Sequence, residues 1–196
     1  MNRSLMHHDS DSERRRAGMT GRKTRERADA VQLRRLYIDC RYGQLHLTTA
    51  YPQSGGFDER TPLLMLHADG GAGADFRLVA ARLGVDRSVY APDLPGCGNS
   101  DGPPRPTIAN QVAALSDLLD ALRLREVDLL GSGRGAQVVF ELAAARPQQV
   151  RRLAVAGPAP AAATSKPLLQ LAADPARCDE QGADAVVAEL RRFLDR

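Results

Sequence analysis

The chain has 196 residues, enough for one domain with a substantial core and too few for two domains of ordinary size. Its 43% hydrophobic and 26% charged residues are typical of a globular protein, and no apolar run approaches membrane-spanning length. The three cysteines are far apart and lack metal-ligand spacing, so we expect no metal site and a reduced, cytoplasmic setting.

The net charge of +3 comes from the N-terminal segment. Residues 1–30 contain eight Lys or Arg against five acidic residues, which leaves residues 31–196 neutral. Clustered arginines attract phosphates, but no aromatic residues interleave these charges and no groove-reading motif follows them. We therefore predict a basic, disordered tail over residues 1–30, a single domain over residues 31–196, and no nucleic-acid partner.

Regular patterns begin at residue 36. The segment "LYIDCRYGQLHLTTAYP" alternates between apolar and polar residues and contains a turn at Tyr42-Gly43, which predicts a β-hairpin. Residues 62–67 form a short apolar run that ends at "ADGGAG", which indicates a buried strand followed by a loop. A helix is predicted over residues 75–83, with Asp75 near its start.

Strands and helices continue to alternate along the rest of the chain. The predicted elements are a strand ending near Pro92, a helix over 107–124 with Thr107 as N-cap, a strand over 127–131, a helix over 134–146 and a strand over 150–157. This alternation, with strands apolar on both faces, predicts an α/β fold with a mostly parallel sheet covered on both sides. Functional residues lie at the carboxyl ends of such strands, which brings together loops 67–75, 93–101 and 131–135.

Three segments in this order resemble an α/β-hydrolase: "LLMLHADGGAGADF", "YAPDLPGCGNSD" and "VDLLGSGRGAQVVFELAAARPQQVRRLAVAG". The resemblance covers about residues 34–157 and implies an ancestral activity, the hydrolysis of a small ester-like substrate. The segment "DLPGCGNSD" has every position of the motif that follows the fourth strand in that family. The resemblance implies that this segment is a structural turn in which Asp93 and Ser100 are scaffold residues.

The family's nucleophile elbow has the form G-x-S-x-G, with its serine on a strained turn between strand and helix. Aligning the outer glycines on Gly131 and Gly135 places Gly133 at the nucleophile position, while Ser132 lies one residue early. Glycine adopts the left-handed conformation almost freely, whereas a residue with a Cβ is strained there by about 1–3 kcal/mol. The substitution therefore removes the nucleophile and eases the turn together.

After its third strand the family shows His-Gly, where this chain has His67-Ala68. The resemblance implies that the backbone amides of Asp69 and Arg134 form the oxyanion hole. We interpret His67 as a hydrogen-bonded structural histidine, with ligand binding as its alternative role.

In this family the acid and then the histidine follow the nucleophile. All histidines of this chain instead precede the elbow, at positions His7, His8, His46 and His67. The segment "KPLLQLAADP" resembles the late strand that presents the acid, with Asp174 as the nearest candidate, and "DAVVAELRRFLDR" resembles the closing helix. The chain thus resembles a shortened α/β-hydrolase whose cap and last strand with its histidine loop are reduced or missing.

Several functions stay open at this point. The first is a hydrolase that uses Ser132 as nucleophile and Asp174 as acid, and the second is a non-catalytic pseudoenzyme that binds a small molecule or a partner. The turn "GSGRGA" also fits the dinucleotide fingerprint, but the next strand ends at Gly157 with no acid to hold a ribose, so we expect no cofactor. A missing last strand exposes a sheet edge, which pairing in a homo-oligomer would protect.

Overall fold

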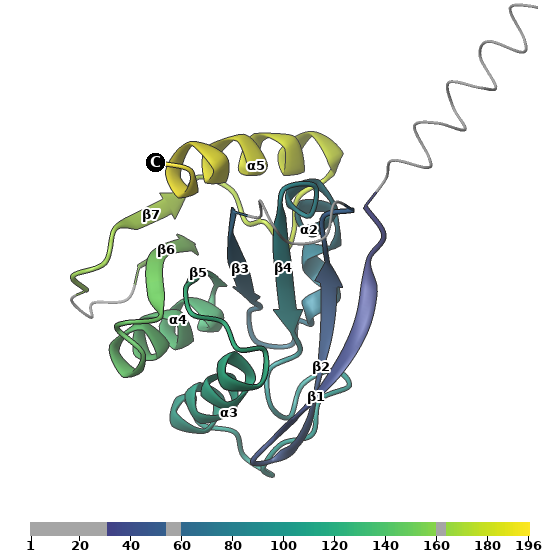
Figure 1. Cartoon of the computed structure of the whole chain (residues 1–196), viewed down its shortest axis with the longest axis vertical. Coiled ribbons are helices and arrows are strands. Elements are labelled where there is room, and N and C mark those ends of the chain that lie inside the picture. Colours follow the sequence, from purple (N-terminus) through teal and green to yellow (C-terminus); the bar gives the residue numbers. More distant parts are fainter. Residues whose placement is uncertain (1–30, 54–59, 160–163) are drawn as a thin grey trace, which may run out of the picture. The chain divides into compact units, whose positions relative to one another are not determined.

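In the part of the chain that the structure describes, seven strands form a single sheet in the order β1-β2-β4-β3-β5-β6-β7 (Figure 1). The computed structural model describes residues 31–53, 60–159 and 164–196, and the predicted N-terminal tail lies outside these described residues. The strands are β1 (Arg34–Cys40), β2 (Gly43–Ala50), β3 (Arg60–Leu66), β4 (Arg87–Pro92), β5 (Val127–Ser132), β6 (Val150–Ala156) and β7 (Leu168–Leu171). Strands β4, β3, β5, β6 and β7 are parallel, as the alternation of elements predicts.

The predicted hairpin is confirmed, because β1 and β2 pair antiparallel with Cys40 opposite Gly43. The turn consists of Arg41 and Tyr42, one residue earlier than predicted, and Gly43 already belongs to β2. Gly43 has φ of 111°, and an added Cβ would lie 2.4 Å from the Asp101 carboxylate. A glycine at this position therefore lets the loop after β4 approach the hairpin.

Helices cover both faces of the sheet. They are the 3-10 helix η1 (Gly73–Phe76) and the α-helices α2 (Arg77–Leu83), α3 (Ile108–Ala121), α4 (Arg134–Ala145) and α5 (Glu180–Leu194). Successive side chains of a strand point to opposite faces, so Leu64 and Leu66 pack in the cluster of α3 and α4, whereas Leu63 and Met65 pack in the cluster of α2 and α5. No helix of the described ranges combines the length and the apolarity needed to cross a bilayer.

Side-chain caps fix where the helices begin. Thr107 Oγ1 accepts a hydrogen bond from Asn110 N at 3.2 Å, which confirms Thr107 as the N-cap of α3. The closing helix begins four residues before the predicted position 184 because Asp179 caps it, accepting from Gly182 N at 2.8 Å.

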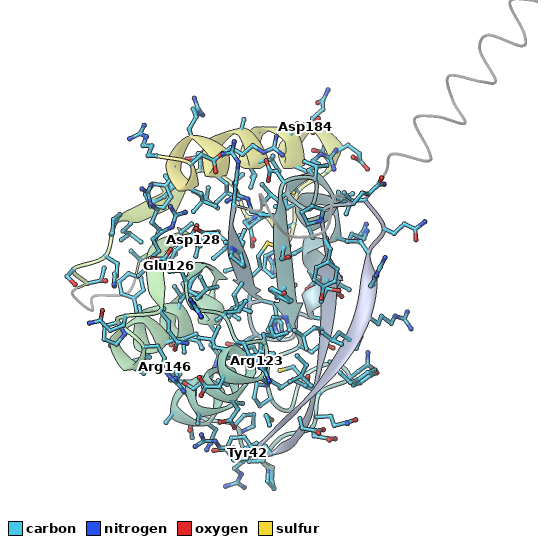
Figure 2. All side chains as sticks on the ribbon, in the orientation of Figure 1. Tyr42, Arg123, Glu126, Asp128, Arg146 and Asp184 are labelled. Atoms are coloured by element: carbon cyan, nitrogen blue, oxygen red, sulfur yellow. The ribbon has the colours of Figure 1, made fainter. Side chains whose placement is uncertain are left out.

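Arginines near the amino ends of the parallel strands hold the end of α5. Arg151 donates to the Leu194 carbonyl at 2.7 Å and to Asp128 Oδ1 at 3.0 Å. Burial raises the pKa of the Asp128 carboxyl, and the Arg151 guanidinium opposes that rise. Figure 2 labels Asp128 near the start of β5 and Asp184 on α5, where Asp184 accepts from Arg82. The last helix is thereby attached to the sheet and to α2.

The buried carboxylate of Asp93, directly after β4, joins three segments of the chain. It is 1% exposed and accepts from Gly73 N at 2.7 Å and from Asn99 N at 2.9 Å. His46 on β2 places its Nδ1 3.0 Å from the same carboxylate. These bonds hold the loops after β3 and β4 against the hairpin, as expected for a scaffold residue.

We expect Asp93→Ala to lower the free energy of unfolding by roughly 3 kcal/mol or more, because it leaves buried donors without their acceptor. Chemical denaturation monitored by circular dichroism measures this change. Asp120→Ala is the matched control, since Asp120 forms a half-exposed ion pair with Arg146 and its loss should change stability by at most about 1 kcal/mol. Equal losses in the two variants would contradict a central role for Asp93.

Candidate active site

The elbow after β5 turns at Gly133, which has φ of 52° and ψ of −118°. Residues with a Cβ are strained in this conformation, whereas glycine adopts it readily. A Cβ added at Gly133 would lie 2.9 Å from the Ala68 Cβ, closer than real Cβ atoms approach. The methyl group of Ala68 thus occupies the space into which a side chain at position 133 would project.

The two flanking glycines allow neighbouring backbone segments to pack closely against each other. A Cβ at Gly131 would lie 2.5 Å from the Gly135 carbonyl oxygen, and a Cβ at Gly135 would lie 2.2 Å from the Leu66 carbonyl oxygen. Neither approach tolerates a side chain, because a backbone atom cannot move aside as a flexible side chain can. The glycines therefore let α4 begin directly against β3 and β5.

The candidate residues Ser132 and Asp174 lie together, although 42 positions separate them in the sequence. Ser132 is 1% exposed, and its hydroxyl donates to Asp174 Oδ1 at 2.6 Å. The same oxygen accepts from Ala176 N at 3.0 Å, and Arg177 Nε lies 3.8 Å from Asp174 Oδ2. The carboxylate after β7 thus binds a buried serine hydroxyl and the start of its own loop.

Backbone groups engage both ring nitrogens of His67. Its Nδ1 lies 2.7 Å from the Ala68 carbonyl oxygen, and its Nε2 accepts from Leu94 N at 2.9 Å. These partners assign the proton to Nδ1, since the carbonyl accepts and the amide donates. His67 therefore ties the loop after β3 to the loop after β4 and has no free nitrogen to serve as a base.

The other described histidine is held to the scaffold. His46 is 5% exposed and bonds to Asp93 through Nδ1, while its Nε2 has no hydrogen-bond partner among the described residues. The Ser132 hydroxyl is instead bonded to Asp174. The arrangement of nucleophile, imidazole and carboxylate that activates a serine is absent from the part of the chain that the structure describes.

The cysteines offer no activated thiol near the elbow. Burial raises the pKa of the Cys97 thiol, and the charges of Asp69 and Asp93 raise it further. Burial also raises the pKa of the Cys178 thiol. Because the thiolate is the reactive form, these environments disfavour nucleophilic chemistry.

A cavity of about 210 Å³ lies beside the elbow, at the carboxyl ends of the strands. Its lining residues come from the loop after β3 and the loop after β7: Ala68, Asp69, Gly70, Gly71, Asp75, Asp174, Ala176 and Arg177. The side chains of Asp69 and Arg134, whose backbone amides are the predicted oxyanion donors, lie near each other, with Arg134 Nε 3.6 Å from Asp69 Oδ1. Within the described ranges no cluster of His, Cys, Asp and Glu is arranged to hold a metal ion.

A mostly parallel sheet with its elbow after β5 and a loop opposite that elbow is the architecture of the α/β-hydrolase class. The chain belongs to this family: the family model described as "alpha/beta hydrolase fold" matches residues 61–195. The outcome confirms the resemblance predicted from the sequence.

Several curated proteins are similar to the chain. A 2-hydroxymuconate semialdehyde hydrolase of Pseudomonas sp. (strain CF600) is 33% identical over 159 residues, which cover 76% of this chain and 50% of that protein. A proline iminopeptidase of Heyndrickxia coagulans is 29% identical, over 62% of this chain and 42% of that protein. The chain thus spans half or less of the length of these relatives.

Solved structures show the same fold at lower identity. An epoxide hydrolase from Vigna radiata superposes with a TM-score of 0.58 at 22% identity, covering 64% of this chain and 40% of that one. A naproxen esterase from Bacillus subtilis superposes with a TM-score of 0.57 at 22% identity, covering 64% and 43%. At this identity the likeness concerns the fold alone.

The contact between Ala68 and Gly133 gives a measurable coupling. We expect Gly133→Ala to lower the free energy of unfolding by about 2–4 kcal/mol, through backbone strain and the clash with Ala68. In an Ala68→Gly background the loss should be smaller by about 1 kcal/mol, because only the strain remains. Denaturant unfolding of the four proteins in this double-mutant cycle measures the difference.

Gly157→Ala is the matched control for that cycle. Gly157 also has a positive φ, of 91°, but nothing lies within 4 Å of an added Cβ. Its substitution should destabilise through strain alone and by the same amount in both backgrounds. Additive effects of Gly133→Ala and Ala68→Gly would show that the methyl group does not restrict the elbow.

Proposed function

We propose that this chain is a non-catalytic α/β-hydrolase homologue that binds a small molecule in the cavity beside its elbow. The observation that supports the proposal is the glycine at the nucleophile position of the elbow. Position 133 has no side chain, and the Ala68 methyl fills the space in front of it. A nucleophile at this point would need both a hydroxyl and room for it, and the chain offers neither.

A catalytic role for Ser132 is the alternative, and its hydrogen bond to Asp174 is the feature that favours it. Two properties of the pair argue against that role. A carboxylate accepts a proton from a serine much less readily than an imidazole does. The hydroxyl is also buried, whereas a nucleophile must meet its substrate.

The comparisons support a small-molecule ligand, because a similar protein carries the name of a hydrolase of 2-hydroxymuconate semialdehyde. The cavity lining carries the carboxylates of Asp69, Asp75 and Asp174 against the single guanidinium of Arg177. Arg134 also lies 3.6 Å from Asp69, which leaves the carboxylates in excess by one. This charge balance favours a neutral or cationic ligand, in contrast to the carboxylate in the substrate name of that relative.

Dinucleotide binding through "GSGRGA" has less support. A pyrophosphate needs glycines that leave the backbone open to it. Here Gly131 and Gly135 face backbone carbonyl oxygens, and Gly133 faces the Ala68 methyl. The glycines of the turn are thus engaged by the protein itself.

Ester hydrolysis tests the proposal. Purified protein incubated with p-nitrophenyl acetate or p-nitrophenyl butyrate should release p-nitrophenol at the buffer rate. The double variant Ala68→Gly/Gly133→Ser restores a hydroxyl and the room for it, yet we expect it to stay inactive, because both ring nitrogens of His67 are bonded to backbone groups and His46 is held by Asp93.

The variants also define the contrary outcomes. Turnover by the wild type that disappears in Ser132→Ala would establish Ser132 as a nucleophile and overturn the proposal. Strong activity in the double variant would reveal a base that the geometry does not indicate. Binding is measured separately from the amide resonances of Gly70 and Gly71 as the butyrate ester is added, and unchanged resonances would argue against the cavity as a binding site.

A further inference from the structure

Among the described residues, strand β1 forms one edge of the sheet and has β2 as its one neighbouring strand (Figure 1). It has seven residues, whereas β7 at the opposite edge has four. An unpaired edge of this length presents backbone donors and acceptors that can bind another strand.

The hydrogen bonds of His46 show which groups of β1 point outward. The N–H of His46 donates to Ser100 Oγ at 2.9 Å and its carbonyl accepts from Asp93 N at 2.8 Å, so both groups point away from β1. Tyr37 lies opposite His46 in the register. In an antiparallel pair, opposite residues either bond to each other or both point away, so the N–H and C=O of Tyr37 face the open edge.

The backbone groups of a strand point in the same direction at every second residue, so the N–H and C=O of Arg35 and Asp39 also face the open edge. The side chains of Arg35, Tyr37 and Asp39 share one face of the strand and are all exposed, with Tyr37 51% exposed. Leu36 and Ile38 lie on the other face and pack against the core. The residues whose backbone groups face the open edge therefore have a cationic, an aromatic and an anionic side chain. The two charged residues lie at equal distances from Tyr37 along the strand.

We propose that two copies of this chain associate by antiparallel pairing of their β1 strands, with Tyr37 opposite Tyr37 on a twofold axis. In this register Arg35 of each copy lies opposite Asp39 of the other, and both ion pairs form at once. The outward N–H and C=O groups of all three residues then find partners across the interface. The two sheets join into one continuous sheet.

Charge selects this register over its neighbours. Other registers that match outward groups place Arg35 opposite Tyr37, Arg41 or a second Arg35, and none of them forms the two ion pairs. Charged residues on an edge strand commonly prevent association with other strands. Here the two charges have opposite signs and equal distances from the axis, so a second copy is attracted.

Charge reversal tests the pairing in the full chain, with the dimer dissociation constant measured by sedimentation equilibrium. We expect the wild type to dimerise and Asp39→Arg to raise the dissociation constant at least tenfold, because each pair then joins two cations. The exchange Arg35→Asp/Asp39→Arg restores both ion pairs with reversed polarity and should restore dimerisation. Arg34→Asp is the control, since it makes a charge change of equal size and opposite sign at a position opposite Cys40 of the second copy, where no ion pair is proposed, and should leave the dimer intact.

Each contrary result overturns the proposal. A wild type that stays monomeric at the highest concentration it tolerates excludes the interface. A dimer that Asp39→Arg leaves unchanged must form through another surface. Failure of the exchange variant to associate, with circular dichroism confirming that it is folded, excludes the pairing of Arg35 with Asp39. The test does not involve the cavity, so its outcome is separate from that of the ester assay.

Discussion

The carboxylate of Asp93 is the interaction on which the arrangement of the site depends. It accepts from Gly73 N and Asn99 N and contacts the ring of His46, so one buried group fixes segments from three parts of the chain. The backbone N–H of the next residue, Leu94, donates to His67 Nε2, and this bond fixes the loop after β3 as well. Because that loop contains Ala68, the position of its methyl group over the elbow follows from these bonds. Buried hydrogen-bond networks commonly have this organising effect.

The proposed loss of catalytic chemistry at the elbow would coincide with relief of backbone strain. A side chain in the left-handed conformation of position 133 stores strain that a working nucleophile requires and a binding protein does not. Glycine removes the strain, and Ala68 uses the vacated space for a packing contact. Natural proteins commonly trade stability against activity at such strained sites. In the proposed non-catalytic protein, Gly133 and Ala68 both favour stability at this site over activity.

Local chemistry made much of the fold predictable. The hairpin, the helix capped by Thr107 and the parallel strands follow from alternation, capping and apolar runs, and the elbow glycines follow from their spacing. The resemblance named Ser132 and Asp174 as candidate catalytic residues, but their direct hydrogen bond did not follow from local chemistry, because it joins segments 42 residues apart and the strand before Asp174 is only four residues long. The cap at Asp179 carried a sequence signal, an acidic residue before a helical pattern, but the apolar positions that mark the helix begin several residues later. Which backbone groups of β1 face the open edge could be inferred only from the hydrogen bonds of His46, and no local sequence pattern reveals those bonds.

The two proposed surfaces lie on different parts of the sheet, and this separation has a consequence. The cavity is built from loops that follow β3 and β7, whereas β2 and β4 stand between β1 and β3 in the strand order. Pairing at β1 extends the sheet in its own plane, away from those loops. Association would therefore leave the cavity open in both copies, and a ligand would bind monomer and dimer alike unless it altered β1 itself. Equal ligand affinities for the two states would mean that binding does not shift the association equilibrium.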